Sequence, residues 1–243
     1  VGLTANYPAF KRTDKYTVSA KTFAPYTSSS KTVIKENLDD EFTSVVNLPF
    51  TFCFFDNAYS KIVIGSNGMI SFDVAQANQP NAPNFSDTLP SDTLPKLSIF
   101  GALHDMYFST SNDSEISYSV IGTAPFRKFI VNFTKGRISG CDELISNSQI
   151  ALSEGSNMIE VFIDNKELPC DITKFKNSLI GINDGTGNLG MAAPNRNTGI
   201  WSAKQEAWVF SPAGNNVIPD FVWYDAANHI IGNTKDIVVC PKK

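Results

Sequence analysis

The sequence predicts an all-β protein, an antiparallel β-sandwich of the jelly-roll type followed by the start of an Ig-like module. Residues 48–73, LPFTFCFFDNAYSKIVIGSNGMISFD, are typical of three consecutive strands joined by two tight turns. Thr, Ser, Asn and Gly are abundant, and long helical periodicities are missing. Eighteen Phe, seven Tyr and three Trp among 243 residues are enough for a sizeable core.

The stretch 48–73 carries the strongest local signals. Leu48–Phe55 is apolar and aromatic, which favours a strand buried on both faces. Asn67-Gly68 accepts the positive φ that a two-residue type I′ turn needs. With these two residues as the turn, Val63 would lie opposite Phe72, and Ile70 would share their face.

The N-terminal 47 residues alternate short strand candidates with polar loops. Lys15–Ala20 and Lys31–Ile34 are the predicted strands. Asp39-Asp40-Glu41 is the densest acidic cluster of the chain. We interpret it as a solvated loop rather than a calcium site, because three neighbouring carboxylates need further oxygen ligands that the sequence does not indicate.

A long polar segment, residues 74–96, follows the central strands and contains the tandem pentapeptide Ser-Asp-Thr-Leu-Pro, at 86–90 and 91–95. Proline at every fifth position predicts an extended, exposed loop. The simpler interpretation is a surface loop that grew by duplication. The alternative is that Thr88 and Thr93 are exposed hydroxyls available for modification.

The second half of the chain predicts further strands and no catalytic group. His104 and Asp105 are adjacent, but neighbours on a strand point to opposite faces, so we expect no dyad. Phe129, Val131 and Phe133 are predicted to share one face. The expected strands are residues 97–103, 114–121, 126–134, 147–152, 158–164 and 179–183.

Pro194–Pro212 contains two closely spaced tryptophans, Trp201 and Trp208. Such a pair is more often part of a core and its cover than a platform for a sugar, although both remain possible ligand contacts. Arg196 is expected to stack or pair with Glu206 near them.

We predict one disulfide among the four cysteines. Cys141 and Cys170 bracket two predicted strands and could meet at the end of the sheet. Cys53 lies inside a strand, where a buried thiol acts as a small hydrophobic group. A partner for Cys240 would lie outside this sequence. The spacings fit no zinc pattern, and we expect neither a metal nor another cofactor.

The charge pattern excludes several classes of partner. The net charge is −4 with no basic stripe, so nucleic acid is not an expected partner. No window approaches the ~20 apolar residues of a membrane helix, so we expect no membrane insertion. Val1 is expected to begin a mature or excised product.

Four blocks of residues occur in sequence along most of residues 12–212: Leu-Pro-Phe-x-Phe-Cys-Phe-Phe (48–55), Ile-Gly-Ser-Asn-Gly-x-Ile-Ser-Phe (64–72), Gly-Thr-Ala-Pro-x-Arg-x-Phe-Ile-Val (122–131) and Arg-Asn-Thr-Gly-x-Trp-x-Ala-x-x-Glu-Ala-Trp-x-Phe-x-Pro (196–212). In this order they resemble the N-terminal region of large secreted Bacteroidota surface proteins. These are the gliding-motility-associated, SprB-like adhesins exported by the type IX secretion system. None of the four blocks is catalytic.

A second similarity is to NIDO-type extracellular modules, which share a Phe-x-Gly-x-x-Tyr and Asn-Gly-x-Ile-x-Phe pattern. Here Asp56 stands at the position of the glycine. The adhesin resemblance also implies cysteines near positions 141 and 170, which supports their pairing. Asp-Thr-Leu, at Thr88 and again at Thr93, resembles the sites at which exported Bacteroidota proteins are O-glycosylated.

We therefore expect two domains, a sandwich at 1–214 and a truncated Ig-like or PKD-like segment at 215–243. The expected function is that of a non-enzymatic adhesin module of a long secreted protein at the cell surface, on the outside of the outer membrane. Its partners would be extracellular surfaces or glycans, and the type IX secretion machinery during export. The alternative is a carbohydrate-binding domain that uses Trp201, Trp208 or the 74–96 loop; a secreted hydrolase is a weaker third hypothesis.

Overall fold

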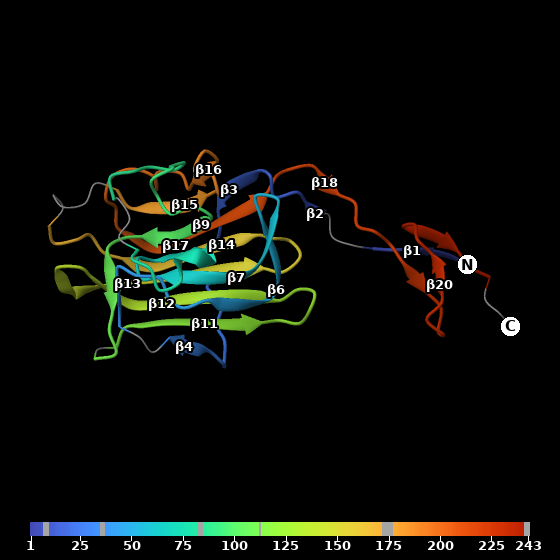
Figure 1. Ribbon diagram of the computed structural model, residues 1–243, viewed down its shortest axis with the longest axis horizontal. Coiled ribbons are helices and arrows are strands. Elements are labelled where there is room, and N and C mark those ends of the chain that lie inside the picture. Colours follow the sequence, from blue (N-terminus) through green and yellow to red (C-terminus); the bar gives the residue numbers. More distant parts are fainter. Residues whose placement is uncertain (7–9, 35–36, 82–84, 112, 172–176, 241–243) are drawn as a thin grey trace.

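The computed structural model describes residues 1–6, 10–34, 37–81, 85–111, 113–171 and 177–240. Residues 82–84 of the predicted 74–96 loop and 241–243 of the tail lie outside these ranges. The described residues form antiparallel sheets, and their one helical segment is the 3-10 turn η1 (Val74–Gln76). The predicted all-β sandwich is therefore confirmed (Figure 1). Within the described ranges, no helix is long and apolar enough to span a bilayer.

The larger sheet has nine strands. β11, β12, β13 and β14 follow one another in the chain and pair in that sequence, and β17 and β3 extend the sheet beyond β14. On the other side, β4 pairs with β11, while β10 pairs with β12 and with β5. The bounds are β3 (Tyr16–Ala20), β4 (Thr32–Ile34), β5 (Leu38–Asp39), β10 (Met106–Phe108), β11 (Glu115–Ile121), β12 (Lys128–Ile138), β13 (Cys141–Ser153), β14 (Ile159–Lys166) and β17 (Ala203–Pro212).

The facing sheet has six strands in the order β16-β15-β9-β8-β7-β6. Their bounds are β6 (Val46–Phe54), β7 (Asn57–Gly65), β8 (Met69–Ser71), β9 (Ser98–Leu103), β15 (Leu179–Asn183) and β16 (Gly190–Ala192). This connectivity differs from the predicted jelly-roll type. Runs of consecutive strands pair with their neighbours within one sheet, whereas a jelly roll is built from Greek-key crossings.

The main core lies between the two sheets. Phe129, Val131 and Phe133 of β12 all face it, as predicted, together with Phe52 and Phe54 of β6. A second apolar cluster, which includes Val63, Met69 and Phe100, lies on the opposite face of the six-stranded sheet. Both faces of this sheet are therefore covered at its centre.

The strand β6 is buried on one face only, contrary to the prediction. Its even-numbered residues from Val46 to Phe54 are buried, whereas Asn47, Pro49 and Thr51 are exposed. β6 is an edge strand of the six-stranded sheet, so Pro49 costs no central ladder hydrogen bond.

The two-residue turn of the central stretch is the first of its two turns and not, as predicted, the second. The two-residue turn with both φ positive is Phe55-Asp56, which joins β6 to β7. The β7–β8 connection has three residues, 66–68, of which only Gly68 has positive φ. Val63 therefore lies opposite Ser71 rather than Phe72, and it faces the second cluster.

The tandem pentapeptide is packed onto the sandwich rather than extended into solvent. Leu89 and Leu94, the leucines of the two copies, are both buried in the second cluster. The side-chain amide of Asn197 binds both backbone groups of Leu89, at 2.8 and 2.9 Å. The segment is thus a structural cover in which Thr88, Asp92 and Thr93 are exposed.

The first and last described strands form a small module apart from the sandwich (Figure 1). β1 (Gly2–Thr4) pairs with β21 (Asp236–Val238), and β19 (Trp223–Tyr224) pairs with β20 (Ile230–Gly232). Between module and sandwich, β2 (Phe10–Lys11) pairs with β18 (Asn216–Val217). β1 therefore completes a ladder with the tail, and the division into domains at residues 214 and 215 stays a prediction.

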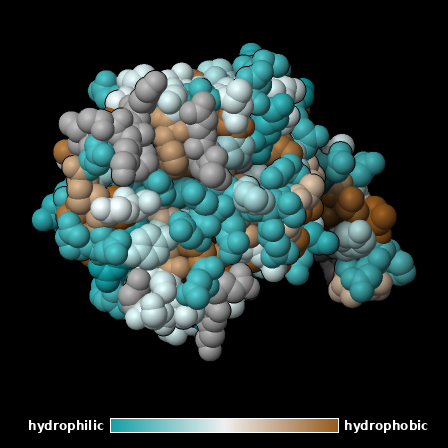
Figure 2. All heavy atoms as spheres, turned by 60° about the vertical axis from the view of Figure 1, so that its left-hand side comes forward, coloured by the Kyte–Doolittle hydropathy of each residue, from teal (hydrophilic) through white to brown (hydrophobic). Residues whose placement is uncertain are grey.

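The small module exposes much apolar surface. Val238 is 83% exposed, and Tyr224 and Ile230 are also largely exposed; Ile218, in the segment that leads to the module, is 80% exposed. Figure 2 shows a hydrophobic patch on the right-hand side, where this module lies, beside a largely hydrophilic sandwich. Its assignment as Ig-like stays a prediction.

Candidate functional site

A segment without regular secondary structure crosses the outer face of the nine-stranded sheet. Residues 21–31, here called the strap, run from β3 at one edge of the sheet to β4 at the other. Phe23 and Tyr26 turn their rings toward Phe162 of β14, with centroids 6.3 and 5.6 Å away in edge-to-face arrangements. The strap therefore has its own contacts with the sheet.

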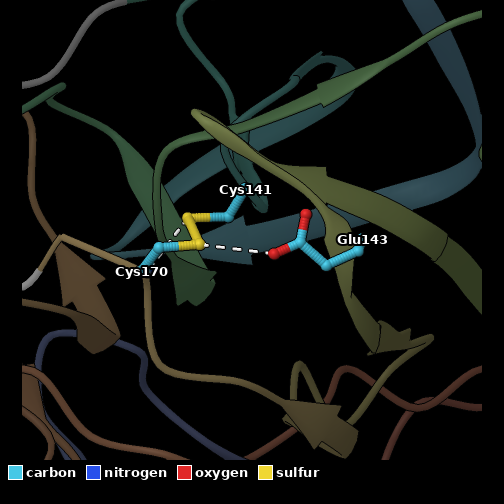
Figure 3. Close-up of a disulfide and its surroundings, with 3 residues drawn as sticks. All are labelled: Cys141, Glu143 and Cys170. Carbon is cyan, nitrogen blue, oxygen red and sulfur yellow. Dashed lines mark hydrogen bonds between the residues drawn. A yellow bond between two sulfur atoms is a disulfide. The ribbon is translucent and has the colours of Figure 1, made fainter.

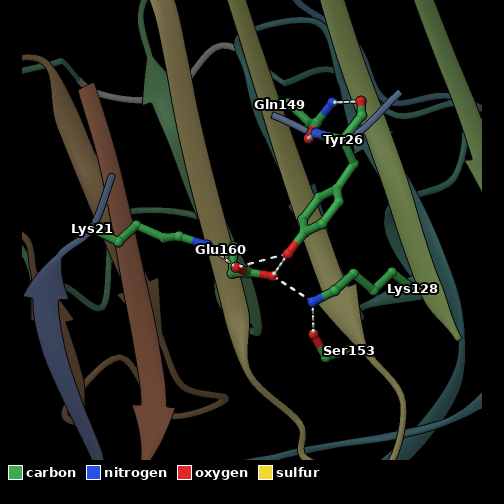
Figure 4. A network of polar contacts seen from close by, with 6 residues as sticks. All are labelled: Lys21, Tyr26, Lys128, Gln149, Ser153 and Glu160. Carbon is green, nitrogen blue, oxygen red and sulfur yellow. Dashed lines mark hydrogen bonds and ion pairs between the residues drawn. The ribbon is translucent and has the colours of Figure 1, made fainter. Parts of the chain in front are cut away.

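A buried carboxylate anchors the strap. Glu160 of β14 is 3% exposed and forms ion pairs with Lys21 of the strap and Lys128 of β12, the latter at 2.6 Å. The hydroxyl of Tyr26 donates to both carboxylate oxygens, at 3.1 and 3.0 Å. Lys128 also donates to Ser153 at 2.7 Å. Figure 4 shows the two ammonium groups and the phenol converging on Glu160.

The network keeps Glu160 ionised. Burial acts to raise its pKa, but the hydrogen bonds from Lys128 and Lys21 outweigh burial and hold the pKa below the ordinary value. For Lys128, burial acts to lower the pKa, and the bond to Glu160 reverses the effect and leaves the pKa raised. The ion pairs therefore persist at neutral pH.

A second anchor binds the strap backbone. Gln149 of β13, 5% exposed, accepts a hydrogen bond from Tyr26 N at 2.9 Å and donates one to Tyr26 O at 2.9 Å. Its Nε2 also donates to Oδ1 of Asn132 at 2.8 Å. Gln149 thus pairs with Tyr26 as a neighbouring strand would (Figure 4).

Beside these anchors lies a cavity of about 260 Å³. Its walls combine the strap with the outer face of the sheet. The lining includes Phe23, Pro25, Tyr26, Asn132, Phe162 and Asp164. Aromatic walls with a few polar groups are characteristic of small-molecule sites.

The predicted ligand contacts, Trp201 and Trp208, lie elsewhere. Trp201 is 9% exposed, and its Nε1 donates to Ser178 O at 2.8 Å. Its ring lies 4.6 Å from both Lys166 Nζ and Arg196 Cζ. Trp201 is therefore a core residue with no face free for a sugar.

Trp208 is half-buried, and its Nε1 donates to Oε1 of Glu206 at 2.5 Å. Glu206 also accepts from Arg196, with Nε to Oε1 at 2.8 Å, so the expected Arg196–Glu206 pair is present. Trp208 covers the core in this arrangement, and neither tryptophan lines the cavity under the strap.

Cys141 and Cys170 are joined in a disulfide at one end of β13, with Cα atoms 5.9 Å apart (Figure 3). Cys170 N donates to Cys141 Sγ at 2.8 Å, and a carboxylate oxygen of Glu143 lies 3.6 Å from Cys170 Sγ. Cys53 is a half-buried free thiol whose pKa is raised by burial, and Cys240 is exposed and free. The bridge ties the β14–β15 connection to β13.

Thr88 and Thr93 are both exposed, but their hydroxyls differ in environment. Thr93 Oγ1 donates to Asp87 and lies 2.9 Å from Ser91 Oγ. We expect glycosylation at Thr88 to be more complete than at Thr93, because the Thr93 hydroxyl must first leave these partners. Peptide mass spectrometry of protein from the native host tests this, and an unmodified 80–96 peptide would contradict it.

Three carboxylates converge at the β5 end of the larger sheet. Asp39, Asp40 and Asp105 each offer an oxygen within 4.8 Å of the others, a set that could hold a hard divalent cation. Asn67, fully buried, donates to Asp40 Oδ1 at 2.7 Å. In the sequence, Asp39 and Asp40 are followed by Glu41. In the fold, the third carboxylate of the cluster is that of Asp105.

Burial, together with Asp40 and Asp39, raises the pKa of Asp105 to about 6. His104 is buried, and burial and the Lys166 charge lower its pKa to about 3, so it is neutral at physiological pH. The adjacent His104 and Asp105 thus have different surroundings, although they lie in the connection between β9 and β10 and not on a strand.

Folded protein binds the Asp105 proton more tightly than unfolded protein does, so stability should fall as pH rises from about 4 to about 6. Asp105→Asn should remove this fall and gain about 1–2 kcal/mol at pH 7, a value reduced for partial solvent screening. Urea denaturation at pH 4.5 and pH 7 measures it, with exposed Asp92→Asn as the control. Parallel pH profiles for the wild type and Asp105→Asn would contradict the prediction.

Comparison with known proteins identifies a family for this chain. A family model described as NIDO related matches residues 15–221, which span both sheets from β3 to beyond β18. No curated protein and no solved structure matches the chain. The match bears out the NIDO-like similarity, while the likeness to SprB-like adhesins stays a prediction. The chain belongs to the NIDO-related family.

Proposed function

We propose that this chain is a non-enzymatic adhesion module of a long secreted protein, used in surface attachment or gliding motility. Display on the outside of the cell, a Bacteroidota origin and export by type IX secretion are parts of the same proposal.

The observation that carries the proposal is how the sandwich is held. β1 and β21 pair in the small module, and β2 and β18 pair between module and sandwich (Figure 1). Two chain segments therefore hold the sandwich from one side and leave its other surfaces available for contact. The Cys141–Cys170 disulfide suits the oxidising conditions outside a cell.

Fab fragments raised against the isolated chain test this function on cells that produce the protein. We expect the Fab to label intact cells and to reduce their attachment to a surface several-fold, whereas an unrelated Fab leaves attachment unchanged. Failure to label intact cells would overturn surface display. Unchanged attachment at saturating Fab would overturn adhesion.

Carbohydrate binding is the second candidate, and the cavity under the strap favours it. Its aromatic and amide lining supplies the apolar and polar contacts that such a ligand needs. Trp201 and Trp208, the ligand contacts proposed from the sequence, do not line this cavity.

A hydrolase is disfavoured. Glycoside hydrolysis needs two carboxyl groups flanking a bound substrate, about 5–10 Å apart. The oxygens of Asp39, Asp40 and Asp105 lie within 4.8 Å of one another, and none of the three residues lines the cavity under the strap.

A further inference from the structure

We infer that the cavity between the strap and the outer face of the nine-stranded sheet binds a single neutral pyranose ring, such as the terminal sugar of a glycan. This inference deepens the carbohydrate-binding candidate and rests on it. The size of the cavity, its charge, its unused polar groups and its pre-organised wall all favour such a ligand.

The size limits the ligand. At about 260 Å³ the cavity is just below the ~300–1,000 Å³ typical of sites for drug-sized ligands. One sugar ring fits this space better than an oligosaccharide. A longer glycan would have to extend from the opening into solvent.

The charge of the lining disfavours anions. Among the described residues that line the cavity, Asp164 is the only charged one. The ammonium groups of Lys21 and Lys128 are taken up by Glu160, and neither residue lines the cavity. A phosphorylated or carboxylated sugar would meet Asp164 without a cation to offset it, whereas a neutral sugar meets no repulsion.

The polar groups of the lining are partly unused. Asp164 is exposed, and the described part of the chain offers it no ion pair, so its oxygens can accept from sugar hydroxyls. Asn132 uses Oδ1 to accept from Gln149, which leaves the Nδ2 hydrogens as donors. An acceptor and a donor beside aromatic rings match the hydroxyls and C–H faces of a pyranose.

The strap wall is held before any ligand arrives. Tyr26 is fixed at its backbone by Gln149 and at its hydroxyl by Glu160. Binding therefore does not have to order this side chain, which lowers its entropic cost. Burying an ion-pair network costs desolvation free energy. Fixing the wall of a binding site is a function that would account for that cost.

The probes are the methyl glycosides of glucose, galactose and mannose, with glucuronic acid and glucose 6-phosphate as anionic comparisons. We expect at least one neutral glycoside to shift, saturably and with millimolar Kd, the NMR signals of the Gln149 and Asn132 side-chain amides. Asp164→Ala and Phe23→Ala should each weaken binding about tenfold or more. Trp208→Phe, outside the cavity, should leave it unchanged.

The inference is overturned if no neutral glycoside produces saturable shifts, if the anionic sugars bind as tightly, or if the cavity variants bind like the wild type. Urea denaturation of each variant separates lost binding from lost folding. The Fab experiment distinguishes this failure from failure of the proposed function: attachment blocked by Fab without glycoside binding leaves adhesion standing and removes only the sugar site.

Discussion

Replacing Glu160 by glutamine should lower the free energy of unfolding by about 2–4 kcal/mol. The carboxylate is 3% exposed and accepts from two ammonium groups and the Tyr26 phenol. Glutamine has nearly the same shape but leaves Lys21 and Lys128 next to each other without a counter-charge. Removing one partner of a buried pair costs about 3–5 kcal/mol, and the partial exposure of both lysines reduces that cost here.

The acid side of the stability profile gives a second readout. Because the folded pKa of Glu160 is lowered, its contribution is present above the unfolded pKa and is lost as pH falls through the folded pKa. Glu160→Gln should lack this acid-induced loss. Hydrogen exchange at the Tyr26 amide, which is bound to Gln149, should quicken as the strap loosens.

Asp113→Asn is the matched control, since Asp113 also pairs with two cations, Lys135 and Arg137, but its side chain is 56% exposed, and exposed ion pairs contribute little. Denaturation curves of Glu160→Gln and Asp113→Asn that coincide would show that the network does not anchor the strap.

Strand alternation accounts for the parts of the fold that could be predicted. Phe129, Val131 and Phe133 occupy every second position, and all three reach the main core. The same alternation is present in Leu48–Phe54, whose odd positions include Pro49 and Thr51. This alternation of apolar and polar positions indicates a strand buried on one face, as the structure shows.

Turn propensity failed where side chains had other partners. Asn67-Gly68 is the best local turn signal, yet Asn67 keeps a negative φ. Its buried side chain accepts from Met106 N at 2.8 Å and donates to Asp40. The two-residue turn falls instead on Phe55-Asp56, where a phenylalanine with φ of 44° has no local reason to be expected.

The candidate site could not be read from the chain because its residues meet only through the tertiary fold. Lys21 and Glu160 are separated by 139 positions. A strand pattern shows that Glu160 lies on the face opposite Ile159 and Val161, but not which loop crosses that face. Trp201 and Trp208 were the aromatic residues that the sequence indicated as ligand contacts, but in the fold Trp201 belongs to the core and Trp208 packs against it.

The stability of the wild-type protein should rise by about 2–3 kcal/mol between pH 7 and pH 9.5, because Lys166 is buried as an ammonium group. Lys166 is 1% exposed, and burial and the Arg196 charge lower its pKa to about 7. The unfolded chain binds this proton more tightly than the folded one, so raising the pH above 7 relieves a cost specific to the folded state.

Lys166→Met should abolish this rise, while Lys204→Met, an exposed lysine on the neighbouring strand β17, should retain it. The comparison is between pH slopes, because Lys166→Met also deprives the Trp201 carbonyl of its donor at 2.8 Å and so changes stability at every pH. Equal slopes in all three proteins would mean that water reaches the Lys166 ammonium group. A slope lost only in Lys166→Met would place the uncompensated charge at the Lys166 ammonium group, 4.6 Å from the ring of the buried Trp201.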